Sequence, residues 1–207
     1  MALTFNQSKG EAQKSKVKSY AYVDGDNKVR LVGDICSRYV YWLKGENDKN
    51  IPMECLSYDR EKETFNNLEK DWVREYYPDQ KCTWSYAIQC IHNGEIQVFN
   101  LKKKLWEQIR VAAEDLGDPT DFETGWDIHF KRVKTGPMAY NVEYQLQPLK
   151  SKPRALTDSE KELVSNLKSM DEVLPRPTPD AQKELLDRLR EGSSDSSSEE
   201  TISEDFD

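Results

Sequence analysis

The chain has 207 residues, of which 36% are apolar and 33% are charged, and its net charge is −8. This length fits one domain with appendages, and no stretch stays apolar for the roughly 20 residues that a membrane-spanning helix needs. The charge is unevenly distributed: residues 191–207 carry seven acidic side chains and no basic one, whereas residues 17–154 are almost neutral. A uniformly basic nucleic-acid binder is therefore excluded, and any cationic surface must be local.

The first half of the chain is predicted to contain three strands. The runs with strand composition, rich in β-branched, aromatic or alternating apolar residues, are residues 29–35, 38–43 and 51–58. Residues 59–79 are expected to be partly helical and to end before Pro78. In this segment Phe65, Leu68 and Trp72 recur at helical spacing.

Two hairpins and a helix are predicted in the middle of the chain. They are a hairpin of residues 83–91 and 96–101, a helix over residues 102–117, and a hairpin within residues 125–149. The first hairpin is indicated by Asn93-Gly94, since a type I′ turn needs positive φ at both central residues. Gly117 is a plausible end for the helix, and Gly136-Pro137 marks the turn of the second hairpin.

The C-terminal part is predicted to contain two short helices and a disordered tail. Thr157 and Glu160 have the spacing of a capping box and predict a helix within residues 156–170. A second helix is expected over residues 180–192, after the stiff linker LPRPTP. Residues 191–207 have too little apolar surface to offset the entropy of ordering them.

These elements predict a mainly β protein with inserted helices. Five to six strands with one helix before the last pair fit a five-stranded Greek-key barrel of the OB type, and an open sheet with a helix is the alternative. The predicted organisation has four parts: a flexible basic arm over residues 1–19, a core over 20–150, a helical extension with a Pro-rich linker over 151–190, and an acidic tail over 191–207.

Neither catalysis nor a metal or other cofactor is expected. The chain contains no P-loop, GxSxG or HExxH motif. Cys82, Cys90 and His92 are the best metal candidates, but four-ligand zinc sites usually include a CxxC pair, which is missing. The four cysteines are interpreted as reduced thiols of a cytoplasmic protein. The acidic run between residues 114 and 127 leaves a Mg²⁺-dependent nuclease as a distant alternative.

Basic side chains cluster beside aromatic ones, which is typical of proteins that bind single-stranded nucleic acid. Such a protein needs cations along the phosphates and flat rings on which bases stack. Phe99 is singled out because Ile96 and Val98 alternate to the other face of their strand and leave Phe99 on a polar face. The candidate contacts are Arg38, Tyr41, Phe99, Lys102, Lys103, Lys104, Lys131, Arg132, Lys134 and Tyr140.

Several segments resemble the single-stranded DNA-binding, helix-destabilising proteins of large tailed bacteriophages. They are VRLVG (29–33), VFNLKKKLWEQI (98–109), GDPTDFETGWDIHFKRVKTG (117–136) and the acidic tail. The resemblance implies an OB-fold core that coats single-stranded DNA with little sequence preference. The expected setting is phage replication, recombination and repair in the host cytoplasm. It also implies that Phe99 and Tyr140 stack on bases.

The resemblance assigns roles to the two ends of the chain as well. The basic run at residues 14–19, with Lys14, Lys16 and Lys18, resembles the family's segment for self-association along DNA. The acidic tail is expected to regulate access of DNA and to recruit replication and recombination proteins. Its expected contacts are Glu199, Glu200, Glu204, Asp205 and Phe206. Several family members hold zinc after the early strands, but residues 56–81 here contain no Cys or His, so no zinc is expected.

Two other binding functions stay open at this point. The nearly neutral core favours a protein-interaction adaptor whose OB-like core binds a protein and whose tail is a docking peptide. Single-stranded RNA is a further possible ligand, since nothing in the sequence distinguishes a contact with a 2′-hydroxyl group.

Overall fold

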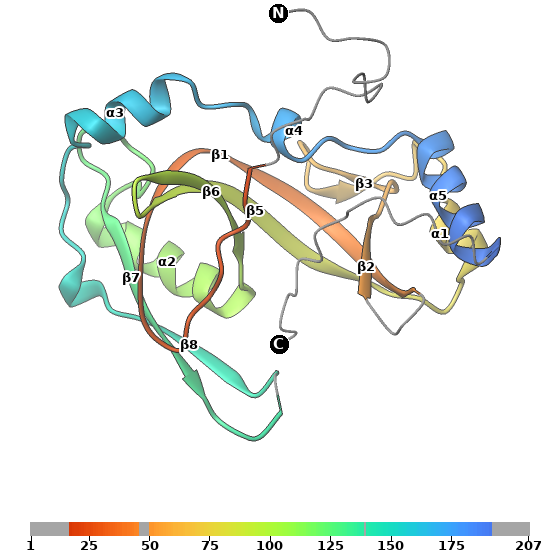
Figure 1. Ribbon diagram of the computed structural model, residues 1–207, viewed down its shortest axis with the longest axis horizontal. Helices are drawn as coiled ribbons and strands as arrows, with labels where there is room; N and C mark the ends of the chain where they lie inside the picture. Colours follow the sequence, from red (N-terminus) through yellow and green to blue (C-terminus); the bar gives the residue numbers. More distant parts are fainter. Residues whose placement is uncertain (1–16, 46–49, 139, 192–207) are drawn as a thin grey trace, which may run out of the picture.

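The main element is a six-stranded antiparallel sheet, seen in a computed structural model that describes residues 17–45, 50–138 and 140–191 (Figure 1). The strands are β1 (Gly25–Lys44), β2 (Asn50–Glu54), β5 (Cys82–His92), β6 (Glu95–Leu101), β7 (Asp127–Lys134) and β8 (Val142–Leu146). Their order is β6-β5-β1-β7-β8, and β2 pairs with the far end of β1. The predicted fold class is confirmed in its coarser form, a mainly β structure with several helices.

Strand β1 joins the two expected early strands into one strand of 20 residues. Its register against β5 shifts between Val32 and Cys36, where Gly33 has a φ of 74°. A side chain at Gly33 would be strained, and its Cβ would lie 2.8 Å from the Cδ2 atom of Leu167. This bulge lets β1 bend, so that its first part pairs with β7 and its last part with β2.

Both predicted hairpins and the helix between them are confirmed. Strands β5 and β6 are joined at Asn93 and Gly94, whose φ values of 50° and 77° suit a type I′ turn. Strands β7 and β8 form the second hairpin. Helix α2 (Lys103–Leu116) follows β6 and ends at Gly117. Helix α2 lies beside β8. The side-chain carbonyl of Gln108 in α2 accepts a hydrogen bond of 2.8 Å from the backbone N–H of Leu146 in β8.

Residues 50–77 form a small lobe inserted between β1 and β5, here called the inserted lobe (Figure 1). Besides β2 it contains the short strands β3 (Tyr58–Asp59) and β4 (Thr64–Phe65) and the helix α1 (Trp72–Tyr76). The expectation of one helix through Phe65, Leu68 and Trp72 is wrong. Glu63 and Asn67 have φ values of 52° and 53°, so the backbone turns twice where a continuous helix would have to run. Phe65 therefore lies in a strand, and Leu68 is exposed.

The largest core fills the inner face of the main sheet, the face on which Leu31, Ile88 and Phe99 lie. Side chains from five strands and from α2 meet there. Its members with the least exposure include Val29, Leu31, Ile88, Phe99, Leu105, Ile109, Trp126, Ile128 and Phe130. Burial of this apolar surface is what holds α2 against the sheet.

Residues 151–191 cross the outer face of the main sheet and end at the inserted lobe, and they are called the strap (Figure 1). The strap contains α3 (Asp158–Ser165), α4 (Met170–Val173) and α5 (Pro179–Glu191). The predicted capping box of Thr157 and Glu160 is confirmed at the start of α3. Outward-facing residues of the sheet contact apolar residues of the strap, as Val32 and Ile96 do with Leu163, Leu167 and their neighbours.

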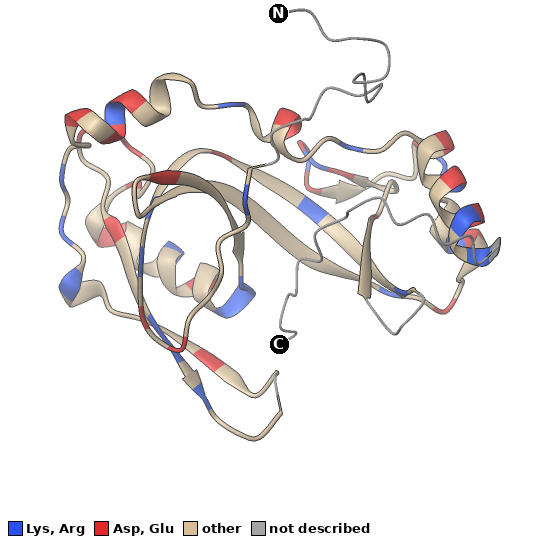
Figure 2. Ribbon diagram, in the orientation of Figure 1, with Lys and Arg blue, Asp and Glu red and all other residues tan. Residues whose placement is uncertain are grey.

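Helices α3 and α5 of the strap carry both acidic and basic side chains, whereas α4 carries acidic ones alone (Figure 2). The beginning of the strap is fixed to β7 by Arg154, whose guanidinium donates to Asp127 at 3.0 and 2.7 Å and to Glu160 at 2.7 and 2.8 Å. The hydrogen bond from Arg154 lowers the pKa of Glu160 to about 2.

None of the helices in the part of the chain that the structure describes has both the length and the apolar composition of a membrane-spanning segment.

Candidate nucleic-acid interface

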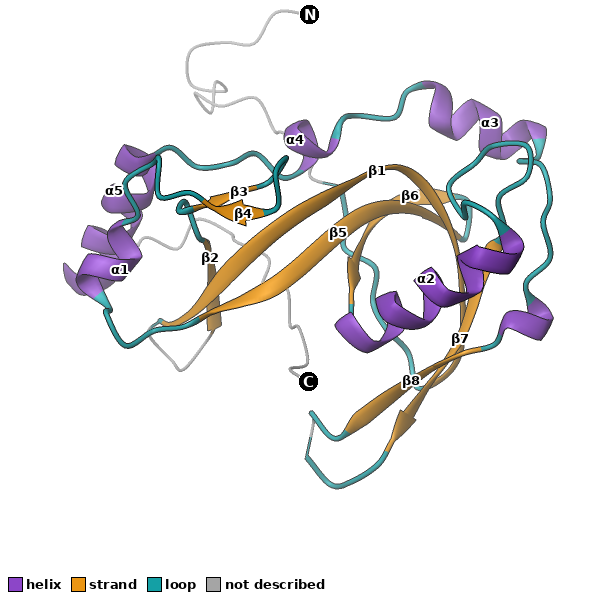
Figure 3. Ribbon diagram, turned by 180° about the vertical axis from the view of Figure 1, so that it is seen from behind, coloured by secondary structure: helices purple, strands orange, loops and turns teal. Residues whose placement is uncertain are grey.

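Strands β1 and β5 run together from the main sheet to the inserted lobe (Figure 3). Half-buried aromatic rings lie in a row on the inner face of this part of the two strands. Tyr39 lies opposite Trp84, and Ser37 lies opposite Tyr86, so these side chains share one face. The rings of Trp84 and Tyr86 stack with their centroids 4.3 Å apart. The ring of Tyr86 also lies 6.0 Å from that of Trp106 in α2.

The row continues into the inserted lobe. The ring of Tyr39 lies 4.9 Å from that of Phe65 and 4.8 Å from that of Tyr58. Tyr58 is buried, whereas Phe65 is 46% exposed. Phe65, Tyr39, Trp84, Tyr86 and Trp106 are together called the aromatic row. It offers partly exposed rings from the main sheet, α2 and the inserted lobe, and exposed rings are the groups on which single-strand binders stack bases.

Three lysines lie at the start of α2, next to one end of the aromatic row (Figure 2). Lys102 is the N-cap residue, and Lys103 precedes Trp106 by three positions, which makes them neighbours on the helix surface. Lys103 and Lys104 are exposed, and neither forms an ion pair with any described residue. The N-terminal end of a helix carries a partial positive charge, so lysines at this end add to a positive local potential. A phosphate bound there would be attracted by both the lysines and the helix end.

The hairpin of β7 and β8 adds a further cation and an exposed ring. Lys134 lies opposite Val142, a residue of the inner core, and therefore lies on the inner face. Its Nζ atom is 3.3 Å from a carboxylate oxygen of Asp24, and the hydrogen bond from Lys134 lowers the pKa of Asp24. Tyr140, in the loop of this hairpin, is 52% exposed.

Two predicted contact residues, Phe99 and Tyr41, are buried, so the prediction that they lie on an accessible surface was wrong. Phe99 is 0% exposed and lies opposite Ile88 in the inner core. Ile96 and Val98 do point to the other face, but the strap covers that face, so both faces of β6 are buried. Tyr41 is buried in the inserted lobe, where its hydroxyl donates to Asp71 at 3.1 Å.

Three predicted cations do not lie exposed beside the aromatic row. Arg132 is buried and forms an ion pair with Asp24. Lys131 is exposed, but it adjoins Arg132 in β7 and so points to the opposite face of the strand. Arg38 is half-buried and lies opposite Ser85 on the outer face of β1, and its Nε atom has no hydrogen-bond partner among the residues that the structure describes.

The predictions for the two ends of the chain fall almost entirely outside the described residues. These are Lys14, Lys16, Glu199, Glu200, Glu204, Asp205 and Phe206. Lys18 is described: it is exposed, and its Nζ atom lies 3.8 Å from Glu95. The backbone around Lys18 pairs with the edge of β6, through hydrogen bonds of 2.8 and 2.7 Å with Val98.

Tyr39, Trp84, Tyr86 and Trp106 were not among the contacts predicted from the sequence. One local signal could have identified two of them. Trp84 and Tyr86 alternate onto the same strand face as Ile88, beyond the end of the aliphatic run in TWSYAIQCI. Large rings that extend a strand past its aliphatic residues lie at the rim of a core, where they are half-exposed.

The structure offers no metal centre among the residues it describes. No group of three or more His, Cys, Asp or Glu side chains in these segments is close enough to hold a metal ion. All four cysteines are free thiols. Burial raises the pKa of Cys55 and Cys90 to about 12, so these thiols are protonated at neutral pH and are poor ligands and nucleophiles.

The chain has a distant relative in a bacteriophage. Over an alignment of 229 positions it is 22% identical to a protein of Escherichia phage T5 named probable ssDNA-binding protein. The alignment covers 93% of this chain and 88% of the phage protein. No protein-family model matches the chain. The resemblance to phage single-stranded DNA-binding proteins is thereby confirmed as a distant homology.

Proposed function

We propose that the chain binds single-stranded DNA on the inner face, with bases stacked on the aromatic row and phosphates near Lys102, Lys103, Lys104 and Lys134. The observation that carries the proposal is the row of partly exposed rings beside Lys103 and Lys104, which are exposed and form no ion pair with any described residue. Base stacking on aromatic rings and backbone contacts with cations need no base-specific groups, so little sequence preference is expected. The name of the phage T5 relative supports this choice of ligand.

The main sheet is, on this proposal, an open form of an OB-type Greek-key barrel. Strands β1, β5 and β6 form a meander, α2 follows, and β7 returns to pair with both β1 and β8. This connectivity is the support for the assignment. The division into an arm (1–19), a core (20–150), an extension (151–190) and a tail (191–207) is part of the same proposal.

The protein is proposed to coat strands rather than to cleave or modify them. It would act during phage replication, recombination and repair in the host cytoplasm, and Lys14, Lys16 and Lys18 would mediate self-association along DNA. A protein-interaction adaptor is the alternative, and it takes over if the full chain fails to bind oligonucleotides even at low salt.

Neutralising the first two lysines of α2 is expected to lower the salt dependence of binding. Each phosphate contact contributes a slope of roughly −0.7 to the plot of log K against log salt for single strands. The double variant Lys103→Gln/Lys104→Gln should therefore bind labelled oligo-dT with a slope reduced by about 1.4. The measurement is fluorescence anisotropy at three or more salt concentrations.

The matched control is Lys161→Gln/Lys168→Gln, which removes two charges from the strap, away from the inner face. This control should leave the slope unchanged. Equal slopes for the wild type and the α2 variant would show that the start of α2 does not contact phosphates.

We further propose that the acidic tail competes with DNA for the inner face and recruits replication and recombination proteins when displaced. A segment with seven acidic side chains and no basic one resembles single-stranded DNA in the sign of its charge. A chain ending at Arg190 should therefore bind oligo-dT more tightly than the full chain, and the difference should shrink as salt rises. Equal affinities at low salt would refute the competitor role of the tail.

A further inference from the structure

The inserted lobe is connected to the main sheet through two strands, β1 and β5. Strand β1 enters the lobe and β5 leaves it, and the bulge at Gly33 interrupts their pairing. The aromatic row crosses this junction: Phe65 belongs to the lobe, and Trp106 belongs to α2 on the main sheet. The relative orientation of the two parts therefore decides whether the rings can contact one strand of bases.

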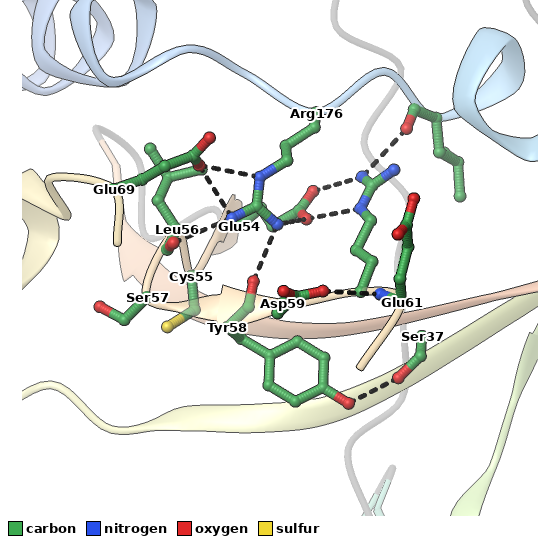
Figure 4. Close-up of polar contacts among 12 residues, drawn as sticks. Ser37, Glu54, Cys55, Leu56, Ser57, Tyr58, Asp59, Glu61, Glu69 and Arg176 are labelled. Carbon is green, nitrogen blue, oxygen red and sulfur yellow. Dashed lines mark hydrogen bonds and ion pairs between the residues drawn. The ribbon is translucent and has the colours of Figure 1, made fainter. Parts of the chain in front are cut away.

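Arg176, in the linker between α4 and α5, fastens the strap to the inserted lobe (Figure 4). Its guanidinium donates to the backbone carbonyls of Leu56 and Tyr58, both at 2.9 Å. It also donates to the carboxylate of Glu69 at 2.9 and 3.0 Å and to that of Glu54 at 3.4 Å. One side chain of the strap thus binds four groups of the lobe.

A second arginine makes the reverse connection, from the lobe to the strap. Arg60 binds the carboxylate of Glu54 through two hydrogen bonds of 2.7 and 2.6 Å. It also donates to Asp171 at 2.8 Å and to the carbonyl of Leu174 at 3.0 Å. The side chain of Glu54 is only 6% exposed, and a buried carboxylate is stable only while its cationic partners stay in place.

The contacts of Arg176 lead directly to the aromatic row. Tyr58, whose carbonyl oxygen accepts from Arg176, packs its ring against Phe65 at 5.2 Å and against Tyr39 at 4.8 Å. The hydroxyl of Tyr58 is hydrogen-bonded to that of Ser37 in β1 at 2.7 Å. Movement of Arg176 would therefore move the rings that form the lobe end of the row.

The other end of the strap is held on the main sheet. Met170 packs with Cys36, Ala87 and Val98 on the outer face, and Leu167 reaches the bulge at Gly33. The strap consequently spans the bend in β1 and is anchored on both sides of it.

We propose that Arg176 is a positioning residue for the inner face: by holding the inserted lobe to the strap, it aligns Phe65 of the lobe with the remaining rings of the aromatic row. The ligand that needs this alignment is a single strand long enough to reach both ends of the row. A strand that contacts one end does not need it. The inference rests on the proposed function and adds a specificity for strand length.

The test compares Arg176→Ala with Arg188→Ala as a matched control. Arg188 is an exposed arginine of α5 that pairs with Glu184 on its own helix, so its loss changes the net charge equally without touching the lobe. Labelled oligo-dT of about 4 and about 16 nucleotides, the limits of the site sizes of single OB folds, are titrated by anisotropy. Amide hydrogen exchange of residues 54–65 and 170–191 is measured on the same proteins without DNA.

Arg176→Ala is expected to increase exchange in both segments and to weaken binding of the long oligonucleotide about tenfold, as the loss of one stacked base does. Binding of the short oligonucleotide should change less than about twofold, and Arg188→Ala should match the wild type throughout. If the alanine variant unfolds, Arg176→Lys is used, since it keeps the charge but cannot donate to four groups at once. A smaller loss with the same length dependence is then expected.

The possible failures are distinguishable. A wild type that binds neither oligonucleotide refutes the proposed function, and the positioning role with it. The positioning role alone is refuted if the wild type binds and hydrogen exchange rises in the Arg176→Ala variant, but its affinities for the two lengths do not separate. This is the case when both affinities equal those of the wild type or when both fall by the same factor. Unchanged exchange in the variant also refutes it, because the lobe is then held without Arg176.

Discussion

Trp84→Leu should weaken binding of oligo-dT by roughly 5- to 150-fold at fixed salt, the equivalent of one lost stacking contact of about 1–3 kcal/mol. Leucine keeps an apolar side chain against the rim of the core but removes the flat ring. Trp84 lies at the centre of the aromatic row, opposite Tyr39 and stacked on Tyr86, so its loss interrupts the row rather than shortening it. Anisotropy titration of the wild type and the variant measures the effect.

The control for this prediction is Phe122→Leu. Phe122 is an exposed aromatic residue in the loop between α2 and β7, outside the aromatic row. Its substitution should leave the affinity unchanged. Thermal unfolding of both variants verifies that they are folded. Equal affinities for wild type and Trp84→Leu, with both folded, would show that the aromatic row is a packing feature and not a base-stacking surface.

Phe99→Ala should lower the free energy of unfolding by about 3–5 kcal/mol, the usual range for deleting a fully buried phenyl ring. The ring contacts those of Tyr20, Tyr22 and Phe130 at centroid distances of 5.2, 5.3 and 5.9 Å, so a cavity would form among aromatic groups that cannot easily close it. Urea denaturation followed by tryptophan fluorescence measures this loss.

Phe65→Ala is the matched comparison, because it removes the same ring from a half-exposed position. It should lose far less stability than Phe99→Ala and should weaken binding of DNA more clearly. The reverse pattern would contradict both assignments: a stable Phe99→Ala variant that no longer binds DNA would identify Phe99 as a stacking residue.

Features set by neighbouring residues were predictable from the sequence. The turn at Asn93-Gly94, the helix ending at Gly117 and the capping box of Thr157 and Glu160 were all confirmed. Each depends on the backbone preference of one or two residues or on a hydrogen bond within one turn. Alternation of side chains along β6 was also predicted correctly.

Which face of β6 meets solvent was beyond the reach of the sequence. Alternation assigns Ile96 and Val98 to one face and Phe99 to the other, but it does not tell whether a distant segment covers either face. The strap begins some 50 residues later in the chain and buries the face that carries Ile96 and Val98. Phe99 was therefore assigned to a surface when it belongs to a core.

The sequence by itself determined the order of the hairpins and helices, the concentration of lysines before Trp106, and the acidic end of the chain. Only the tertiary structure decided which rings stay accessible: Tyr39, Trp84, Tyr86 and Phe65 come together from three strands, and Trp106 joins them from α2. The reason is physical. Turns and caps depend on local interactions, whereas the exposure of a ring depends on every segment that packs near it.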